Sequence, residues 1–334
     1  MAKRGIECED STSKKQTIDP LLLKLRADGY AVVPAIISDE HIEILHQSFW
    51  TWISGFGTGI RREDPSSWKT SNWPPSIRGL IQHYGIGHAK FVWELREFLS
   101  VRKVFATIHG LDDSKETKTK TQLVVSFDGA CLSKAETTKV DPVKNSWAHM
   151  DQGPKTTGNM VQGLMSLTQA GPGRGGLICY KNSHKLHTDF FMRFPEMVAK
   201  IGSNDWVKLE QKHKDWYFRR GCIETQVEAP PGSLILWYSK TVHWAARPVK
   251  SYPLPRAAIY LCYQPRRDGT EKQLKKKREV FAARRMTSHW PLKSKMFATR
   301  MRDWGDETLK IRFPDQPTIR DDEVTPVMKQ LAGY

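Results

Sequence analysis

Eight short apolar segments, separated by turn-forming residues, dominate the chain between residues 121 and 265. Short strands with turns at this spacing are typical of antiparallel sandwiches and jelly rolls. We therefore expect a mainly β fold with flanking helices. The expected strands cover residues 122–127, 146–151, 160–168, 176–180, 222–229, 233–237, 242–247 and 257–264.

The rest of the chain flanks this strand region. Residues 1–17 are polar and are expected to be disordered. Residues 18–120 are expected to be mainly helical and to belong to one domain with the strands, 18–265. Residues 266–334 form a basic extension, whose aromatic residues predict that it packs on the core. These are Trp290, Phe297, Trp304 and Phe313.

Three helix starts are recognisable in the helical region. Asp19-Pro20 places a proline in a first helical turn. Ser38 can cap a helix that runs to about Trp52. A third helix is expected from about Ala89 to Leu99.

A His-x-Asp pair and a distant histidine indicate a metal site. His149 and Asp151 stand two positions apart in an expected strand, so their side chains share a face. His243 follows the expected strand 233–237. Two imidazoles and one carboxylate form the ligand set of non-haem Fe(II) sites that keep positions open for oxygen and a co-substrate. The alternative is that both histidines are ordinary polar residues satisfied by hydrogen bonds.

Two further His-x-Asp pairs occur, and chance alone gives on the order of one in such a chain. His187 and Asp189 follow a segment expected to be a loop. His213 and Asp215 lie in a charge-dense stretch expected to be a solvated helix face. Both pairs leave less room for strands before the distal histidine, so we expect them to be bystanders.

Arg256 opens an apolar run thirteen residues after His243. Two adjacent antiparallel strands would bring both residues to one pocket wall. A guanidinium pairs with a carboxylate through two parallel hydrogen bonds, which suits an organic dicarboxylate better than a lysine would. The alternative is a surface arginine after Pro253-Leu254-Pro255.

Several of these segments resemble the phytanoyl-CoA dioxygenase family of Fe(II)- and 2-oxoglutarate-dependent oxygenases. The resemblance extends over roughly residues 18–265. It rests on residues 25–34, 147–152, 161–168, 175–185 and 232–237, the last of which precede the distal histidine.

The resemblance implies a double-stranded β-helix core, a cupin-like jelly roll. It also implies the cofactor Fe(II), the co-substrate 2-oxoglutarate and the consumption of O2. His149, Asp151 and His243 would be the catalytic iron ligands. Arg256 would pair with the distal carboxylate of 2-oxoglutarate.

The chain departs from the family pattern in the co-substrate pocket. Ala245 replaces a hydroxyl residue that often follows the distal histidine, and Leu164 stands where a tryptophan is common. Related halogenases have a small residue in place of Asp151, so its presence favours hydroxylation. The expected substrate is a small organic molecule or an acyl thioester. The alternatives are the same chemistry on nucleic acid or protein, or a non-catalytic jelly-roll binding protein.

Five further residues near these motifs are candidates for lining the pocket, binding a ligand or forming a turn. Trp147 and Trp244 adjoin the ligands and can wall the substrate pocket, with core packing as the alternative. Gln152 is a candidate for hydrogen bonding to substrate, and Gln162 for binding the co-substrate. Asp128 is expected to be a turn residue.

The formal net charge of +16 arises from 52 basic and 36 acidic residues. Such an excess favours anionic partners or substrates. Residues 275–278, Lys-Lys-Lys-Arg, lie in an expected helix over about 271–285. This helix can pack on the domain through Leu274 and Phe281 and expose its basic face to solvent. The alternatives are a nuclear-import signal, a nucleic-acid contact or a clamp for an acidic small molecule.

The cysteines and the N-terminal segment predict where in the cell the protein is located. Its five cysteines are scattered and form no Cys-x-x-Cys pair, which is typical of reduced thiols. Residues 1–17 lack an apolar signal sequence, and the apolar run 30–37 is too short to cross a bilayer. We therefore expect no membrane contact and an intracellular location, cytoplasmic or nuclear.

Overall fold

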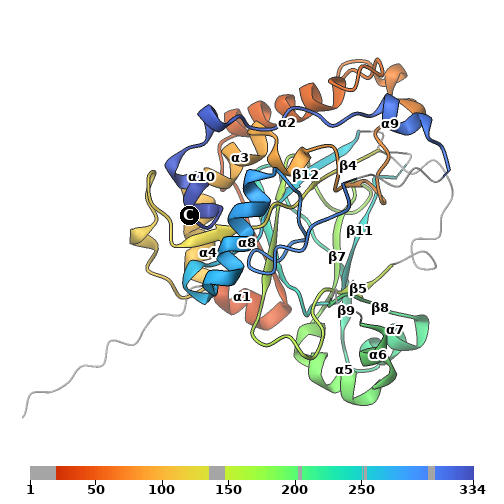
Figure 1. Cartoon of the computed structure of the whole chain (residues 1–334). Helices are drawn as coiled ribbons and strands as arrows, with labels where there is room; N and C mark the ends of the chain where they lie inside the picture. Colours follow the sequence, from red (N-terminus) through yellow and green to blue (C-terminus); the bar gives the residue numbers. More distant parts are fainter. Residues whose placement is uncertain (1–19, 135–146, 202–204, 250, 252–253, 300–304) are drawn as a thin grey trace, which may run out of the picture.

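The computed structural model describes residues 20–134, 147–201, 205–249, 251, 254–299 and 305–334. The expected disordered tail, together with Cys8, Asp19, Ser146 and Trp304, lies outside the described residues. Figure 1 shows a central body of strands with helices on its periphery.

Two antiparallel sheets form the centre of the molecule, and a two-stranded pair, β13-β3, lies beside them. The larger sheet has the order β1-β10-β6-β12-β4-β2, and the smaller β8-β5-β11-β7-β9. This arrangement confirms the mainly β jelly-roll prediction. The strands are β1 Tyr30–Val33, β2 Leu80–Ile81, β3 Leu123–Val125, β4 Ala130–Ser133, β5 His149–Met150, β6 Val161–Ser166, β7 Gly176–Lys181, β8 Val207–Lys208, β9 Ile223–Gln226, β10 Ser233–Tyr238, β11 His243–Ala246, β12 Arg256–Tyr260 and β13 Tyr263–Pro265.

Strand β10 shows how the sequence places the two sheets face to face. Its residues alternate between two apolar clusters, as the period of two in a strand requires. Leu234 and Leu236 join the cluster beneath the N-terminal helices. Ile235 and Trp237 join a cluster that also contains Leu177 of the smaller sheet. The space between the sheets is therefore lined by every second residue of each strand.

Helices cover the outer faces of both sheets. The larger sheet packs against α1 Pro20–Asp28, α2 Asp39–Ser54, α3 Lys90–Glu97 and α4 Leu99–Ile108. The smaller sheet carries α5 His187–Arg193, α6 Glu196–Lys200 and α7 Gln211–Phe218, which gather at one end of the molecule (Figure 1). The Ser38 side chain caps α2 by accepting a hydrogen bond from His41 N, as expected. In the described parts of the chain, no helix has the length and apolarity needed to cross a membrane.

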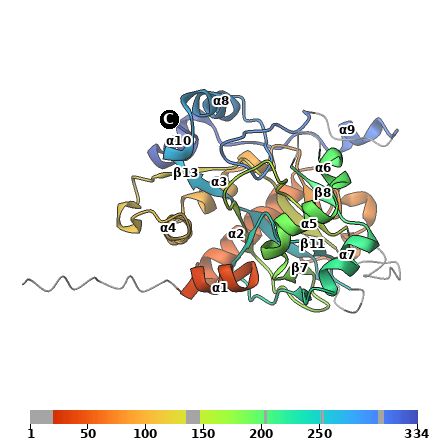
Figure 2. The same cartoon turned by 90° about the horizontal axis from the view of Figure 1, so that it is seen from below.

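The extension beyond residue 265 lies against the core. It contains α8 Glu271–Ala282, α9 Thr308–Arg312 and α10 Pro326–Leu331. Figure 2 shows α8 and α10 side by side, on the opposite side of the molecule from α1. Leu274, Phe281, Trp290 and Phe313 are all buried. The packing of α8 through Leu274 and Phe281 is as expected.

Some local predictions were wrong. The short strands β2, β4 and β8 were not anticipated, and the expected strand 257–264 divides into β12 and β13. The stretch around His213 is helical, but His213 is fully buried because its ring packs against Phe190 and Phe194. Its Nδ1 accepts a hydrogen bond from the backbone N of Glu210 at the start of α7.

Candidate metal centre

His149, Asp151 and His243 meet between the two sheets. Strands β5 and β11 are hydrogen-bonded neighbours, and His149 stands directly opposite His243 in their register. Asp151 Oδ1 lies 3.7 Å from His149 Nε2, and Asp151 Oδ2 lies 3.3 Å from His243 Nε2. One ligand atom from each residue lies within 4.8 Å of the other two. Ligand atoms about 2 Å from one ion would stand about 3 Å apart, so this cluster fits a metal ion.

Both imidazoles are oriented for metal binding by their own strands. The Nδ1 atom of His149 lies 3.0 Å from the carbonyl oxygen of Trp147. The Nδ1 atom of His243 lies 2.9 Å from the carbonyl oxygen of Thr241. Such a bond fixes the proton on Nδ1 and leaves the Nε2 lone pair free for a metal.

A glutamine holds the carboxylate. Gln162 Nε2 of β6 donates a hydrogen bond of 2.8 Å to Asp151 Oδ2 and one of 3.2 Å to Ser239 Oγ. This contact links the two sheets at the site. Gln162, expected to bind the co-substrate, therefore contacts a metal-ligand candidate directly.

Burial and charge prepare these groups for a cation. Burial, aided by His243, lowers the pKa of His149 to about 4, so its imidazole is neutral at pH 7. Burial alone would raise the pKa of the Asp151 carboxyl, but His289, His149 and His243 lower it overall. Asp151 is therefore ionised. A neutral imidazole and an ionised carboxylate are the states in which these two groups bind a divalent metal.

The triad borders a cavity of about 530 Å³ between the sheets. The lining residues that lie in strands, called the inner end here, include Leu164, Leu177, Trp237, Arg256 and Tyr260. The lining residues that lie outside the strands, called the outer end here, include Ile77, Trp147, Trp206, Ser288, His289, Trp290 and Phe297. A volume of this size accommodates a small-molecule ligand.

Arg256 contributes a buried charge to the inner end. It is 2% exposed, and its Nη1 donates to Cys131 Sγ at 2.9 Å while Nε has no hydrogen-bond partner. Within the described residues Arg256 forms no ion pair. The surface-arginine alternative is therefore wrong. The adjacent-strand prediction is also wrong, because Arg256 lies in the larger sheet and faces His243 of the smaller one across the cavity.

Of the three residues predicted to contact the substrate, two border the cavity and one does not. Trp147 borders the cavity and stacks on His149, with 4.5 Å between ring centroids. Trp244 also borders it, but its ring packs edge-on against Tyr180 in the cluster beneath α5–α7. Gln152 is not among the cavity-lining residues. Its side-chain amide donates to the carbonyl oxygens of Thr156 and Gly158, which places it in its own loop.

Several cavity-lining residues were missed or misassigned in the sequence. His289 and Trp290 come from the C-terminal extension, more than forty positions after the last predicted ligand. Asp128, expected in a turn, is buried at the cavity, and burial raises the pKa of its carboxyl. The aromatic content of the extension indicated packing on the core, but no local pattern indicated which surface it would cover.

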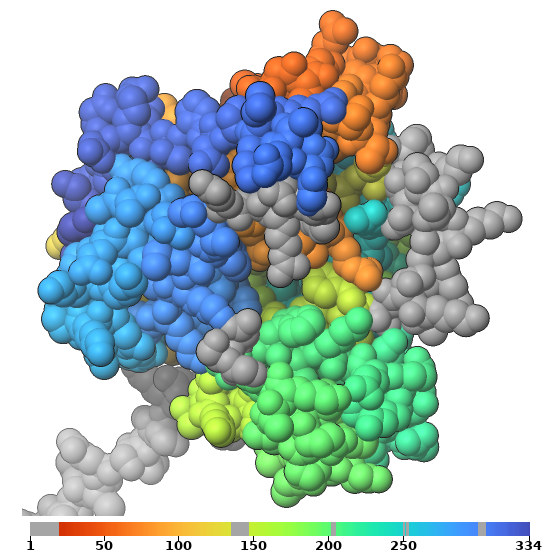
Figure 3. Space-filling model, turned by 45° about the vertical axis from the view of Figure 1, so that its right-hand side comes forward, coloured from red at the N-terminus to blue at the C-terminus, as the bar shows by residue number. Residues whose placement is uncertain are grey.

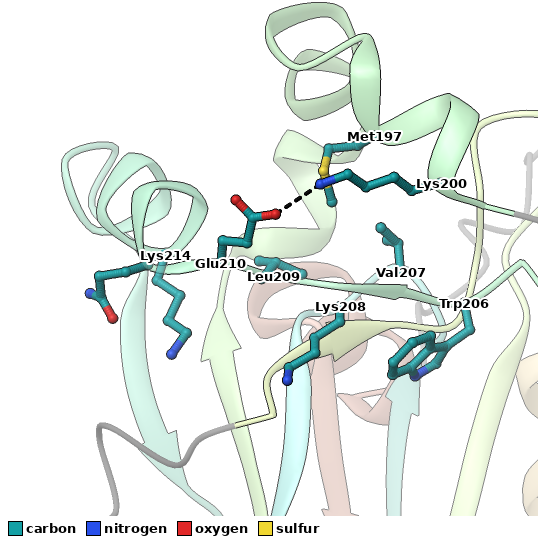
Figure 4. A pocket seen from close by; sticks show the side chains of 9 residues that line it. Met197, Lys200, Trp206, Val207, Lys208, Leu209, Glu210 and Lys214 are labelled. Atoms are coloured by element: carbon teal, nitrogen blue, oxygen red, sulfur yellow. Dashed lines mark hydrogen bonds and ion pairs between the residues drawn. The ribbon is translucent and has the colours of Figure 1, made fainter.

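A second hollow lies beside the smaller sheet, at β8 (Figure 4). Trp206 lines both hollows, whereas an ion pair of 2.8 Å between Lys200 and Glu210 spans the second one. Of the described residues, only the His149, Asp151 and His243 group meets the geometry of a metal cluster, and it lies in the first cavity. The first cavity is therefore the candidate active site.

Comparisons with known proteins found a curated relative and several similar solved structures. It is 31% identical over 269 residues to the Ava biosynthesis cluster protein O of Aspergillus versicolor, a match that covers 79% of this chain and 83% of the relative. No family model matches, so the resemblance to phytanoyl-CoA dioxygenases in particular stays a prediction.

Solved structures show likeness at low sequence identity. The structure of GlcNAc Inducible Gene 2, GIG2 (DUF1479), from Candida albicans matches 94% of this chain and 81% of its own at 10% identity, with a TM-score of 0.52. The epimerase SnoN, in complex with Fe3+, alpha ketoglutarate and nogalamycin RO, matches 73% of this chain and 82% of its own at 17% identity, with a TM-score of 0.47. These likenesses concern the fold.

Proposed function

The chain belongs to the family of the Ava biosynthesis cluster protein O, and from this premise we propose that it is a non-haem Fe(II)- and 2-oxoglutarate-dependent dioxygenase. Its substrate would be a small organic molecule, because the relative is named for a biosynthesis cluster. The reaction would be hydroxylation of a substrate carbon.

The observation that carries the proposal is the pairing of the triad with Arg256 across one cavity. The triad offers three ligand atoms and leaves its cavity side open, as an oxygen-activating site requires. Arg256 is a buried guanidinium without a carboxylate partner among the described residues. A buried charge without a counter-ion is costly, so an anionic ligand at this position would stabilise it.

Fe(II) bound by the triad would couple the oxidative decarboxylation of 2-oxoglutarate with O2 to hydroxylation of the substrate, releasing succinate and carbon dioxide. The residues of the chain would position the reactants. Arg256 would hold the distal carboxylate of 2-oxoglutarate, and Gln162 would fix the orientation of the Asp151 carboxylate. The burial of all three ligands would keep bulk water from the reacting atoms.

The basic helix α8 gives no specific support to nucleic acid as the substrate. Lys277 is buried, and its Nζ donates to the carbonyl oxygens of Val125 and Pro291. Arg278 is bound to Gly333 O and Glu271. Lys276 also forms an ion pair of 4.0 Å with Glu279, so three of the four basic residues of the run are engaged within the protein. The small-molecule hypothesis is therefore the stronger one.

Stoichiometric turnover tests the proposal. The purified protein, supplied with Fe(II), O2, 2-oxoglutarate and ascorbate as the two-electron reductant that takes the place of the substrate, should form one succinate for each 2-oxoglutarate consumed, and chelation of the iron should stop both. If 2-oxoglutarate is not consumed under any metal loading, the protein is not a dioxygenase of this kind. The non-catalytic binding alternative would then stand.

A further inference from the structure

The charges that line the cavity cancel. The charged lining residues are three carboxylates and three cations: Asp128, Asp151, Asp205, Arg256, Lys293 and Lys295. A divalent metal and a dianionic co-substrate would leave that balance unchanged. In spite of the overall charge of +16, the space that remains for a substrate has no excess of positive charge.

The cations at the outer end are also poorly placed to bind an anion. Lys293 Nζ forms an ion pair with Asp205, lies 3.1 Å from Thr156 Oγ1 and stands 4.2 Å from the centroid of the Trp290 ring. Lys295 is exposed at the cavity mouth. The Lys293–Asp205 pair joins the C-terminal extension to the segment before β8, and Figure 3 shows the extension and α5–α7 on one face of the molecule.

Three consecutive residues of the extension present polar atoms without hydrogen-bond partners. Ser288 Oγ, His289 Nε2 and Trp290 Nε1 are each buried and unpaired, although all three side chains line the cavity. Trp290 itself is 6% exposed. Leaving such a group unsatisfied is unfavourable, and polar groups in protein interiors are paired in the great majority of cases. A ligand whose polar atom reaches one of these groups would satisfy it.

These three residues line the same cavity as the metal ligands His149, Asp151 and His243. Two further aromatic rings flank the same region, because Trp147 stacks on His149 and the Trp206 ring lies 5.7 Å from the His149 ring. An apolar ring can pack against these surfaces while its polar substituent reaches the extension.

From this arrangement we infer that residues 288–290 form the substrate-recognition wall, and that the substrate is a ring-containing molecule whose end facing the metal is uncharged and carries a carbonyl or hydroxyl oxygen. The indole N–H of Trp290 only donates hydrogen bonds, so it selects an acceptor. Ser288 and His289 hold the same substituent from the neighbouring positions. The inference rests on the proposed function, since it concerns the substrate of that site.

Two matched probes test it: 2-naphthamide, which is neutral with a carbonyl acceptor, and 2-naphthoate, its anionic counterpart. Each is titrated calorimetrically, without oxygen, into the full chain loaded with Fe(II) and 2-oxoglutarate. We expect the amide to bind at least tenfold more tightly than the carboxylate. Trp290→Phe, which keeps the ring and removes the donor, should weaken amide binding roughly fivefold to tenfold. Ser288→Ala should weaken it about twofold to fivefold.

Trp216→Phe is the matched control. The indole Nε1 of Trp216 is also buried and unpaired, and a cation also stacks on its ring, but Trp216 lies in the cluster beneath α5–α7 and does not line the cavity. We expect this variant to bind both probes as the unmodified chain does. Equal effects of the two Trp→Phe changes, tighter binding of the carboxylate, or no binding of the amide would overturn the inference. Failure of the unmodified chain to bind Fe(II) and 2-oxoglutarate would instead overturn the proposed function.

Discussion

The two ends of the cavity are built from different kinds of structure. Strands of both sheets form the inner end, where Arg256 supplies a buried positive charge. The outer end includes the C-terminal extension, and its unpaired polar atoms are uncharged. Strand positions are fixed by hydrogen-bonded register, so the inner end suits a constant, charged co-substrate. A wall from a separate segment can change without disturbing the sheets, so the outer end suits a specific substrate.

The metal ligands line the same cavity as both ends, and removing one should have the largest effect on turnover. We expect Asp151→Ala to lower turnover more than about 100-fold, because even changes to residues that only support ligands cost 10–100-fold. Asp189→Ala is the matched control, since Asp189 belongs to a second His-x-Asp pair but is exposed on α5. Turnover is measured as succinate formation, with circular dichroism to check folding. Full activity of the Asp151 variant would remove the site assignment.

A change confined to the inner end should affect the co-substrate alone. Arg256→Ala is expected to raise the 2-oxoglutarate requirement at least about 30-fold, since truncating one partner of a buried charge pair costs 2–5 kcal/mol. The iron requirement should change little. Lys295→Ala removes a positive charge at the cavity mouth and serves as the control, with an expected change in KM for 2-oxoglutarate of about twofold or less. An unchanged KM in the Arg256 variant would mean that another residue holds the carboxylate.

The two glutamines that follow the ligand strand β5 should differ in their effect on iron binding. Gln162→Leu removes the hydrogen bond to Asp151 and should weaken Fe(II) binding roughly 10-fold. Gln152→Leu breaks only contacts within its own loop and should leave iron affinity unchanged. Iron titrations of both variants measure the difference. Equal losses would show that Gln162 does not act through the carboxylate.

Charges outside both ends should matter least. Lys275→Gln together with Lys276→Gln removes two exposed charges of α8, and we expect turnover within twofold of the unmodified chain. Lys277→Met should instead lower the free energy of unfolding by about 1–3 kcal/mol, because it leaves buried carbonyl groups without a donor. Thermal unfolding should show a loss of stability in the Lys277 variant. A large loss of turnover in the double variant would return an anionic or nucleic-acid substrate to consideration.

The parts of the molecule with a local signal were predictable. The period of two in a strand predicted that His149 and Asp151 share a face, and their side chains do meet. The apolar run before His243 indicated the strand at 233–237. The cap at Ser38 likewise depends on neighbouring residues only. The two-residue strands β2 and β8 are too short to have a periodic signal.

Contacts between distant segments could not be read from the sequence. The sequence indicated that Arg256 begins a strand, but the sheet to which this strand belongs is decided by its pairing with β4 and β6. The contribution of residues 288–290 depends on how the whole extension lies on the core. Neither their spacing nor their residue types differ from those of an ordinary packed segment.

An anaerobic titration with 2-oxoglutarate tests the central claim most directly. The claim is that the triad and Arg256 together bind iron and the co-substrate in one cavity. The Fe(II)-loaded protein should develop the visible charge-transfer band of a chelated 2-oxoglutarate complex, and Asp151→Ala should not. A protein that binds iron without developing the band, or an Asp151 variant that develops it in full, would contradict the account.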